Sequence, residues 1–192
     1  MAKHFIIADT HFYHKNIIEY ANRPFQRVAE MNDALVKNWN SVVGPEDIVY
    51  HLGDVAFGNR SNLVNIIHRL NGQIILIKGN HDRLPNAVYE REGLFVCKYG
   101  YYNTHCIGFA GDEFSPINAT HRPVPGYHDK KVIGWIFYGH VHNKPCFLEN
   151  RDGTVCISAE RINYTPLCLE DFFASKGITQ VHFIDRSVDF RY

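Results

Sequence analysis

Short apolar runs alternate with segments of helical spacing in the first half of the chain. Three runs rich in β-branched residues are typical of buried strands, at 4–9, 47–54 and 73–80. Apolar residues recur at helical spacing over 28–43 and again over 61–72, where Ser61 is the expected N-cap and a glycine the expected stop. Strand–helix alternation of this kind predicts an α/β fold.

The second half of the chain has a different pattern, because strand-like runs dominate it. They lie within 94–111, 132–140, 154–159 and 179–186. One late helix is expected over 165–177, with Pro166 near its first turn. A strand-rich half after an alternating half predicts two sheets. No internal repeat, low-complexity tract or Pro/Gly/Ser-rich linker interrupts the sequence, so residues 1–192 are expected to form a single domain.

Composition narrows the class of protein. Hydrophobic residues make up 45% of the chain and charged residues 21%, which is typical of a soluble globular protein. The 20 acidic side chains balance the 20 Lys and Arg side chains, so the formal net charge is zero. Any binding of a polyanion must therefore come from a local site, and strong binding to duplex nucleic acid is not expected.

Cysteine usage and the N-terminal residues indicate the compartment. The five cysteines are scattered, and no two of them form a CxxC pair. This pattern argues against a disulfide framework or a thiolate zinc site and favours a reducing, cytoplasmic location. The chain enters its first strand almost at once, which leaves no room for a signal peptide. No apolar run approaches the roughly 18 residues that span a bilayer, so no membrane partner is expected.

Polar side chains follow five of the apolar runs. Carboxylate, imidazole or amide groups stand at these strand ends: Asp9 and His11; Asp54; Asn80, His81 and Asp82; His121; His140 and His142. Loops at the carboxyl ends of strands in an open α/β sheet converge on one crevice. In "FYGHVH" (137–142), an extended chain would point both histidines to one side, which suits a metal ion.

The donors are numerous enough for two metal ions. Two aspartates, three histidines and one asparagine are available before a fourth histidine is chosen between His105 and His121. One carboxylate can then bridge two divalent ions, whose mixed oxygen and nitrogen shells suit Mn²⁺, Fe or Zn²⁺ rather than Mg²⁺ alone. Such a pair generates a hydroxide nucleophile at neutral pH. His81 follows a candidate ligand and could protonate a departing alkoxide. Spacing alone does not assign donors to ions.

The motifs "DTH", "GD", "GNHD", "THRP" and "GHVH", in this order across residues 9–142, closely resemble those of the calcineurin-like metallophosphoesterases. The strings "DTHFYHKNI", "RPF" and "ERINYTPLCLEDF" are similar to those of the small single-domain microbial members. The "THRP" motif resembles the family's Ser-His-x-Pro, with threonine in place of serine, and this favours His121 over His105. The resemblance implies a four-layer αββα sandwich of two mixed β-sheets flanked by helices, with a dimetal site at one sheet edge.

The resemblance also implies a role for each motif residue. It implies two ligand sets: Asp9, His11 and His142 for one metal, and Asn80, His121 and His140 for the other. Asp54 would bridge the two ions. A metal-bridging hydroxide would attack phosphorus, and His81, oriented by Asp82, would be the general acid. The expected cofactors are two divalent ions, Mn²⁺, Fe or Zn²⁺, with Mn²⁺ the most effective in vitro.

Several residues beside the motifs have two open interpretations. His14, Arg83 and Arg122 are candidate substrate contacts, although a solvated surface arginine is an equal alternative for the two arginines. His51 shares a strand end with Asp54 and is a candidate second-sphere residue.

The function expected from these features is hydrolysis of phosphate esters, with diesters favoured over monoesters and a nucleotide among the candidate substrates. The complete donor set with His81, and no visible cap domain, favour diesters. "GDVAFGNR" lacks the Gly-Asp-x-x-Asp-Arg-Gly pattern of protein phosphatases, which argues against that activity. A phosphomonoesterase and a non-catalytic scaffold of the same fold are the alternatives.

Overall fold

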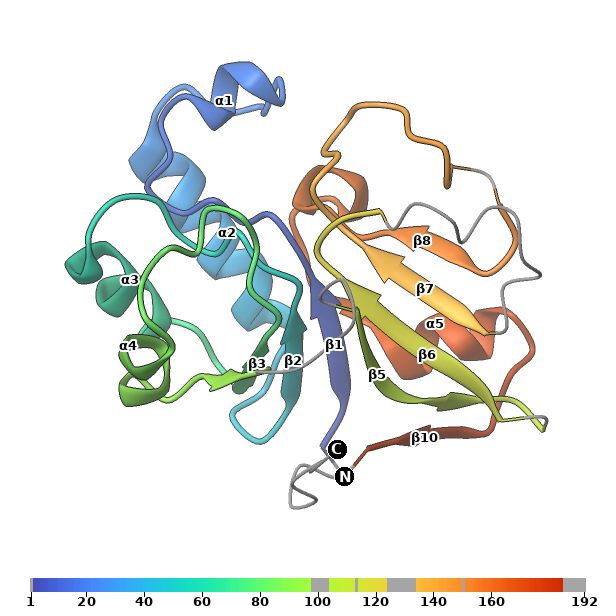
Figure 1. Ribbon diagram of the computed structural model, residues 1–192. Coiled ribbons are helices and arrows are strands. Elements are labelled where there is room, and N and C mark those ends of the chain that lie inside the picture. The colour runs from blue at the N-terminus through green and yellow to red at the C-terminus, as the bar shows by residue number, and fades with distance from the viewer. Residues whose placement is uncertain (1, 98–103, 113, 124–133, 150, 185–192) are drawn as a thin grey trace.

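The computed structural model describes residues 2–97, 104–112, 114–123, 134–149 and 151–184. Two five-stranded sheets form its centre (Figure 1). The first has the strand order β4-β3-β2-β1-β9, in which β1 to β4 are parallel and β9 is antiparallel to β1. Its strands are β1 (His4–Ile7), β2 (Ile48–His51), β3 (Gln73–Leu76), β4 (Phe95–Val96) and β9 (Leu167–Cys168).

The second sheet is also mixed, with the order β10-β5-β6-β7-β8. Its strands β6, β7 and β8 are parallel, whereas β5 is antiparallel to both of its neighbours. The strands are β5 (Thr104–Ala110), β6 (Ser115–Thr120), β7 (Trp135–Tyr138), β8 (Thr154–Cys156) and β10 (Val181–Phe183). The predicted α/β sandwich of two mixed sheets is therefore confirmed.

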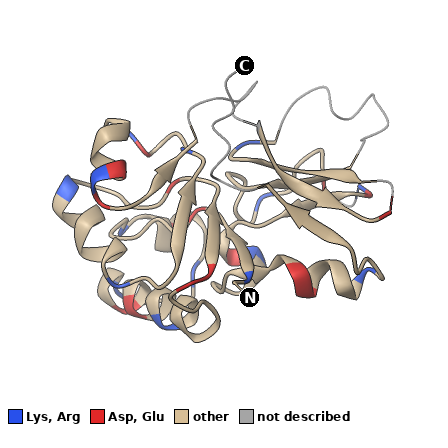
Figure 2. Cartoon of the chain, turned by 90° about the horizontal axis from the view of Figure 1, so that it is seen from below, with Lys and Arg blue, Asp and Glu red and all other residues tan. Residues whose placement is uncertain are grey.

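Helices α1 to α4 gather on the side of the first sheet that faces away from the second sheet (Figure 1). The helices are α1 (Ile17–Tyr20), α2 (Val28–Val42), α3 (Arg60–Ile67), α4 (Asn86–Arg91) and α5 (Leu169–Ser175), with a 3-10 helix, η2 (Ala159–Ile162). Phe173 of α5 packs edge-on against Trp135 and Phe137 of β7. Seen from below, acidic and basic positions are interspersed along the helices (Figure 2).

The strands of the first sheet are buried on both faces. In β1, Phe5 and Ile7 pack with Trp39 of α2, whereas Ile6 packs with Phe137 of the second sheet. Side chains alternate across a strand, so the two faces of one sheet serve two separate cores. This double burial is why the strands have continuous apolar sequences.

Two details of the predicted helices are wrong. Helix α3 is capped by Asn59, whose side chain accepts a hydrogen bond from Asn62 N, and not by Ser61; it also ends at Ile67, well before the expected glycine stop. The late helix begins at Leu169, because Pro166 precedes the short strand β9 and not the first helical turn. Within the described residues no helix is long and apolar enough to cross a membrane.

Candidate metal centre

The polar loops that the sequence singled out meet where the two sheets adjoin. They follow the carboxyl ends of β1, β2, β3, β6 and β7. The backbone of Ala8 forms a parallel bridge with Ser158, just beyond β8, and this bridge joins the first sheet to the second at the site. Donors that are far apart in sequence therefore form two groups, each with ligand atoms within 4.8 Å of one another.

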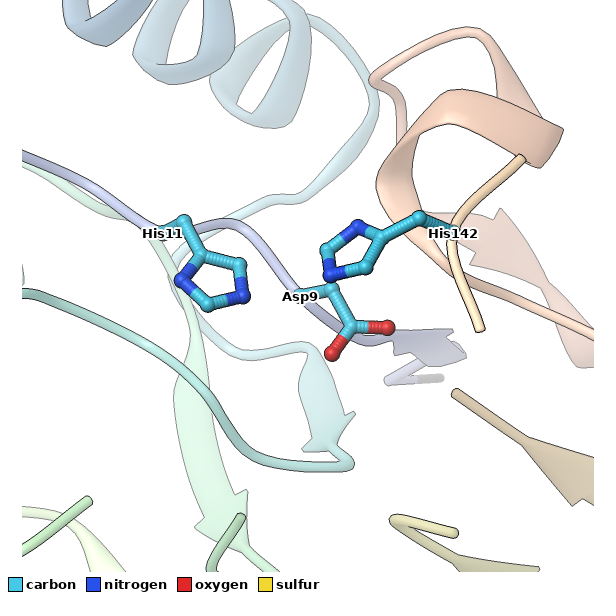
Figure 3. Close-up of side chains that lie close together, drawn as sticks. All are labelled: Asp9, His11 and His142. Carbon is cyan, nitrogen blue, oxygen red and sulfur yellow. The ribbon is translucent and has the colours of Figure 1, made fainter. Parts of the chain in front are cut away.

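The first group is formed by Asp9, His11 and His142 (Figure 3). Asp9 Oδ2 accepts hydrogen bonds from His140 N and Ser158 Oγ, both at 2.7 Å. Asp9 Oδ1 and His11 Nε2 are buried and have no hydrogen-bond partner among the described residues. Buried polar atoms are rarely left unpaired, and an ion bound between these atoms would satisfy them. The group thus fits a divalent metal.

The second group is formed by Asp54, His121 and His140. His121 Nδ1 lies 2.7 Å from the carbonyl oxygen of Leu52, and donation there leaves a lone pair on Nε2. That Nε2 lies 3.0 Å from Asn80 Oδ1 and 3.5 Å from Asp54 Oδ2. Three electron-donating atoms converge, as they do around a shared cation.

Asp54 connects the two groups. Its Oδ2 atom lies 3.4 Å from His11 Nε2 and 3.5 Å from His121 Nε2. Its Oδ1 atom accepts a hydrogen bond from His81 N at 2.8 Å. A Cβ at Gly79 would lie 2.2 Å from this Oδ1 atom, so the "GN" motif requires glycine for steric reasons. One carboxylate oxygen therefore faces both groups while the other is fixed by the backbone.

Sequence reasoning missed a buried ion pair behind the first group. Arg23 binds Glu160 Oε1 through Nη2 at 2.7 Å and Nε at 2.8 Å, and both side chains are almost fully buried. Glu160 faces His142 Nδ1 at 3.1 Å, which leaves the Nε2 atom of His142 for a metal. Arg23 also donates to the carbonyl oxygens of Asp9 and Thr10. No local pattern reveals a contact between two residues 137 positions apart.

Burial sets the pKa of the histidines. It lowers the pKa of His11 well below its usual value, with the charge of His142 adding to the effect. Burial also lowers the pKa of His140 to about 4. Both rings are therefore neutral near pH 7, as ligands must be. Burial lowers the pKa of His142 too, but the hydrogen bond that His142 donates to Glu160 and the charge of Asp9 outweigh burial and raise that pKa overall.

His140 and His142 do not share one spot, and the expectation of an extended chain there is wrong. Strand β7 ends at Tyr138, and both histidines have a positive φ, of 72° and 51°. His142 belongs to the first group and His140 to the second. Gly139 between β7 and His140 packs so tightly that a Cβ would lie 2.5 Å from Ala8 Cβ.

The orientation of His81 by Asp82 stays a prediction. Asp82 accepts hydrogen bonds from the backbone N–H groups of Asp54, Val55 and Gly79, at 2.7, 3.1 and 2.8 Å. Both carboxylate oxygens of Asp82 therefore accept hydrogen bonds from the loops that carry the candidate ligands. The His81 ring lies at the edge of the first group, with its centroid 5.4 Å from that of His11.

The residues beside the motifs lie at varied distances from the two groups. His14 lies beside the first group, since its Nδ1 is 3.2 Å from His11 Nδ1. Arg122 directly follows His121 of the second group. Its charge adds to the lowering of the His140 pKa, after the larger effects of burial and of the His121 charge. Arg83 lines a cavity with His81.

His51 and His105, the other two histidines considered from the sequence, lie outside both groups. His51 Nδ1 accepts from Gly53 N at 3.1 Å, and its Nε2 lies 3.0 Å from Thr10 Oγ1. His51 therefore ties together the loops that carry Asp9 and Asp54. His105, on β5, belongs to neither of the two groups found among the described residues, and burial lowers its pKa to about 4.

Two mixed sheets with paired histidine–carboxylate groups at their junction are the arrangement of the metallophosphoesterase fold. The chain belongs to the calcineurin-like phosphoesterase family, whose model matches residues 3–190. It is therefore grouped with proteins that hydrolyse phosphoric esters.

Similar proteins include the uncharacterized protein MJ1445 of Methanocaldococcus jannaschii, which is 38% identical over 88% of this chain and 89% of the relative. The Gene 66 protein of Mycobacterium phage L5 is 34% identical over 74% of this chain and 79% of its own length. The fold is similar to that in the crystal structure of a protein of unknown function, AQ665 from Aquifex aeolicus, with a TM-score of 0.68 and 24% sequence identity. The superposition covers 90% of this chain and 98% of the AQ665 chain. That structure supports the fold alone.

Proposed function

We propose that this chain hydrolyses phosphodiesters with two divalent metal ions and with His81 as the general acid. The observation that carries this proposal is the position of Asp54 Oδ2, which lies within 3.5 Å of a histidine Nε2 atom from each side. A carboxylate oxygen so placed is suited to bridging two ions. When bound, such ions act as Lewis acids and supply a hydroxide nucleophile at neutral pH.

The chain's own residues divide into two ligand sets around Asp54. We assign Asp9, His11 and His142 to one ion, and Asn80, His121 and His140 to the other. The mixed oxygen and nitrogen donors favour Mn²⁺, Fe or Zn²⁺, and we expect Mn²⁺ to support activity in vitro. The unpaired Asp9 Oδ1 and His11 Nε2 atoms support this assignment.

His81 is assigned the transfer of a proton to the oxygen of the departing alcohol. Its backbone N–H is fixed on Asp54 Oδ1, while its half-buried ring borders the first group. An alkoxide leaves poorly without a proton, so an acid at this position matters most for diesters of ordinary alcohols. His14, Arg83 and Arg122 are proposed to contact the substrate, the two arginines through phosphate oxygens.

The direct test is hydrolysis of bis-p-nitrophenyl phosphate compared with p-nitrophenyl phosphate. The protein is stripped of metal with a chelator, and Mn²⁺ is added back. We expect diester cleavage that depends on Mn²⁺ and exceeds monoester cleavage. Cleavage of the monoester alone would identify a phosphatase, and two bound metals without turnover of either ester would favour the scaffold.

A further inference from the structure

A cavity adjoins the candidate metal centre beside His81. Its volume is about 230 Å³, and its lining includes Phe57, Leu63, His81, Arg83 and Leu84. None of these residues belongs to the two ligand sets. However, the segment around Phe57 follows Asp54 closely, and His81 directly follows Asn80, so the cavity begins where two ligand-bearing loops end.

Phe57 presents a flat surface to this cavity. Its ring stacks on the His14 ring with 4.2 Å between centroids and an interplanar angle of 11°. His14 covers one face of the phenyl ring, yet Phe57 remains 43% exposed. An aromatic ring that is held from one side and exposed on the other is suited to stacking on a planar group.

The position of His81 indicates which half of a substrate the cavity would hold. The His81 ring lies near the metal centre and also lines the cavity, with its centroid 5.4 Å from that of His11 and 6.0 Å from that of Phe57. A general acid must reach the oxygen that leaves. The cavity that His81 lines is therefore on the side of the leaving alcohol.

We propose that this cavity binds the leaving alcohol of the substrate and that this alcohol carries a single planar ring system, which stacks on Phe57. The inference rests on the proposed phosphodiesterase function and names its substrate class. The cavity is smaller than the roughly 300–1,000 Å³ of sites for drug-sized ligands, and a volume of about 230 Å³ suits one ring system. Arg83 adds positive charge to the lining and disfavours a cationic ring.

The test uses two mixed diesters, benzyl methyl phosphate and cyclohexylmethyl methyl phosphate. Their larger alcohols are similar in size and acidity, but only the benzyl ring is planar. Water cleaves one P–O bond, so the products are either methyl phosphate with the larger alcohol or methanol with the larger phosphate ester. With Mn²⁺ and the wild-type chain, we expect methyl phosphate and benzyl alcohol, and a higher kcat/KM for the benzyl diester.

Three variants separate stacking from general effects. Phe57→Leu is expected to lower kcat/KM for the benzyl diester by roughly fivefold to 100-fold. The kcat/KM for the cyclohexylmethyl diester should fall much less. Phe57→Tyr keeps a ring and should keep the preference. Phe95→Leu changes an exposed phenyl ring outside the cavity lining and should change neither rate.

Each contrary outcome has its own meaning. Release of methanol as the main product, or equal kcat/KM for the two diesters in the wild-type chain, would overturn the inference even if Phe57→Leu failed to fold. If the wild-type chain cleaved bis-p-nitrophenyl phosphate but the ring preference survived in a folded Phe57→Leu, the stacking on Phe57 would also be wrong. No Mn²⁺-dependent cleavage of bis-p-nitrophenyl phosphate would instead overturn the proposed function itself.

Discussion

Left-handed backbone conformations are concentrated at the candidate ligands. Positive φ angles of 49° to 72° occur at Asp9, His11, Asp54, His140 and His142. For residues with a side chain, such a conformation costs on the order of 1–3 kcal/mol and persists only where the surroundings enforce it. Here the surroundings include the tightly packed Gly79 and Gly139. The chain therefore holds these side chains in place by its own packing.

Asp54 is the residue whose charge matters most to both groups. Asp54→Asn removes the negative charge that faces His11 and His121, so the affinity for at least one ion should fall. We expect the loss of one or both metals and of nearly all turnover, on the order of 1,000-fold. Metal content per chain and the rate on bis-p-nitrophenyl phosphate are the measurements. Full activity in this variant would contradict a dinuclear site.

His81→Gln tests the acid role. Gln has no proton of suitable acidity, so turnover of alkyl esters should fall by roughly 100-fold to 10,000-fold, whereas p-nitrophenyl esters should lose much less. Metal content should stay the same, because the His81 contact with Asp54 is made by the backbone N–H. The ratio of alkyl to aryl rates is the measurement. Equal losses on both would argue for a positioning role only.

At the scale of elements, the long buried strands were predictable, whereas the short strand β9 inside the expected helix 165–177 and the backbone conformation of the loops were not. Runs such as 4–9 and 73–80 are buried on both faces, so apolar sequence alone identified them. The turn at His140 and His142 was not predicted, because local spacing does not encode a positive φ. The Arg23–Glu160 ion pair was not predicted for another reason, because its two residues become neighbours only through the tertiary fold.

The short helix η2 connects this ion pair to the metal centre, and Glu160→Gln tests the connection. Loss of the carboxylate weakens the contact that orients His142, so the ion of the first group should bind roughly 10- to 100-fold less tightly. The ion of the second group should bind as before. Two-site metal titration by calorimetry measures both affinities, with circular dichroism to verify folding.

A matched control is available for this variant. Glu149 forms another ion pair, with Arg161 at 3.0 Å, and this pair is partly exposed. Glu149→Gln removes its carboxylate. It should leave both affinities unchanged. Equal weakening of both sites by Glu160→Gln would mean that the ion pair acts on the fold and not on His142.

For the whole molecule, burial of histidine predicts sensitivity to acid. Burial lowers the pKa of His51 to about 3, from the usual 6.5. The unfolded chain therefore binds a proton between these pH values that the folded chain does not. This contribution to stability is complete above pH 6.5 and is lost progressively as the pH falls toward 3. It amounts to about 2 kcal/mol between pH 7 and pH 5.

Urea unfolding of the metal-free chain at pH 7 and pH 5 measures this effect. His51→Gln should be less stable at pH 7, because His51 ties two loops together, but its stability should fall less between the two pH values. His11 and His140, whose pKa values are also lowered, should keep part of the slope in both proteins. An unchanged slope in the variant would show that His51 is protonated in the folded state.

The bridge between Ala8 and Ser158 brings together the proposed ligands of a single ion from both sheets. Asp9 comes from the loop after the first strand, whereas His142 and its partner Glu160 lie far toward the other end of the sequence. Neither sheet alone carries a complete ligand set. A growing chain could therefore complete the proposed first ligand set only after His142 had left the ribosome, so metal binding would follow the synthesis of strands from both sheets.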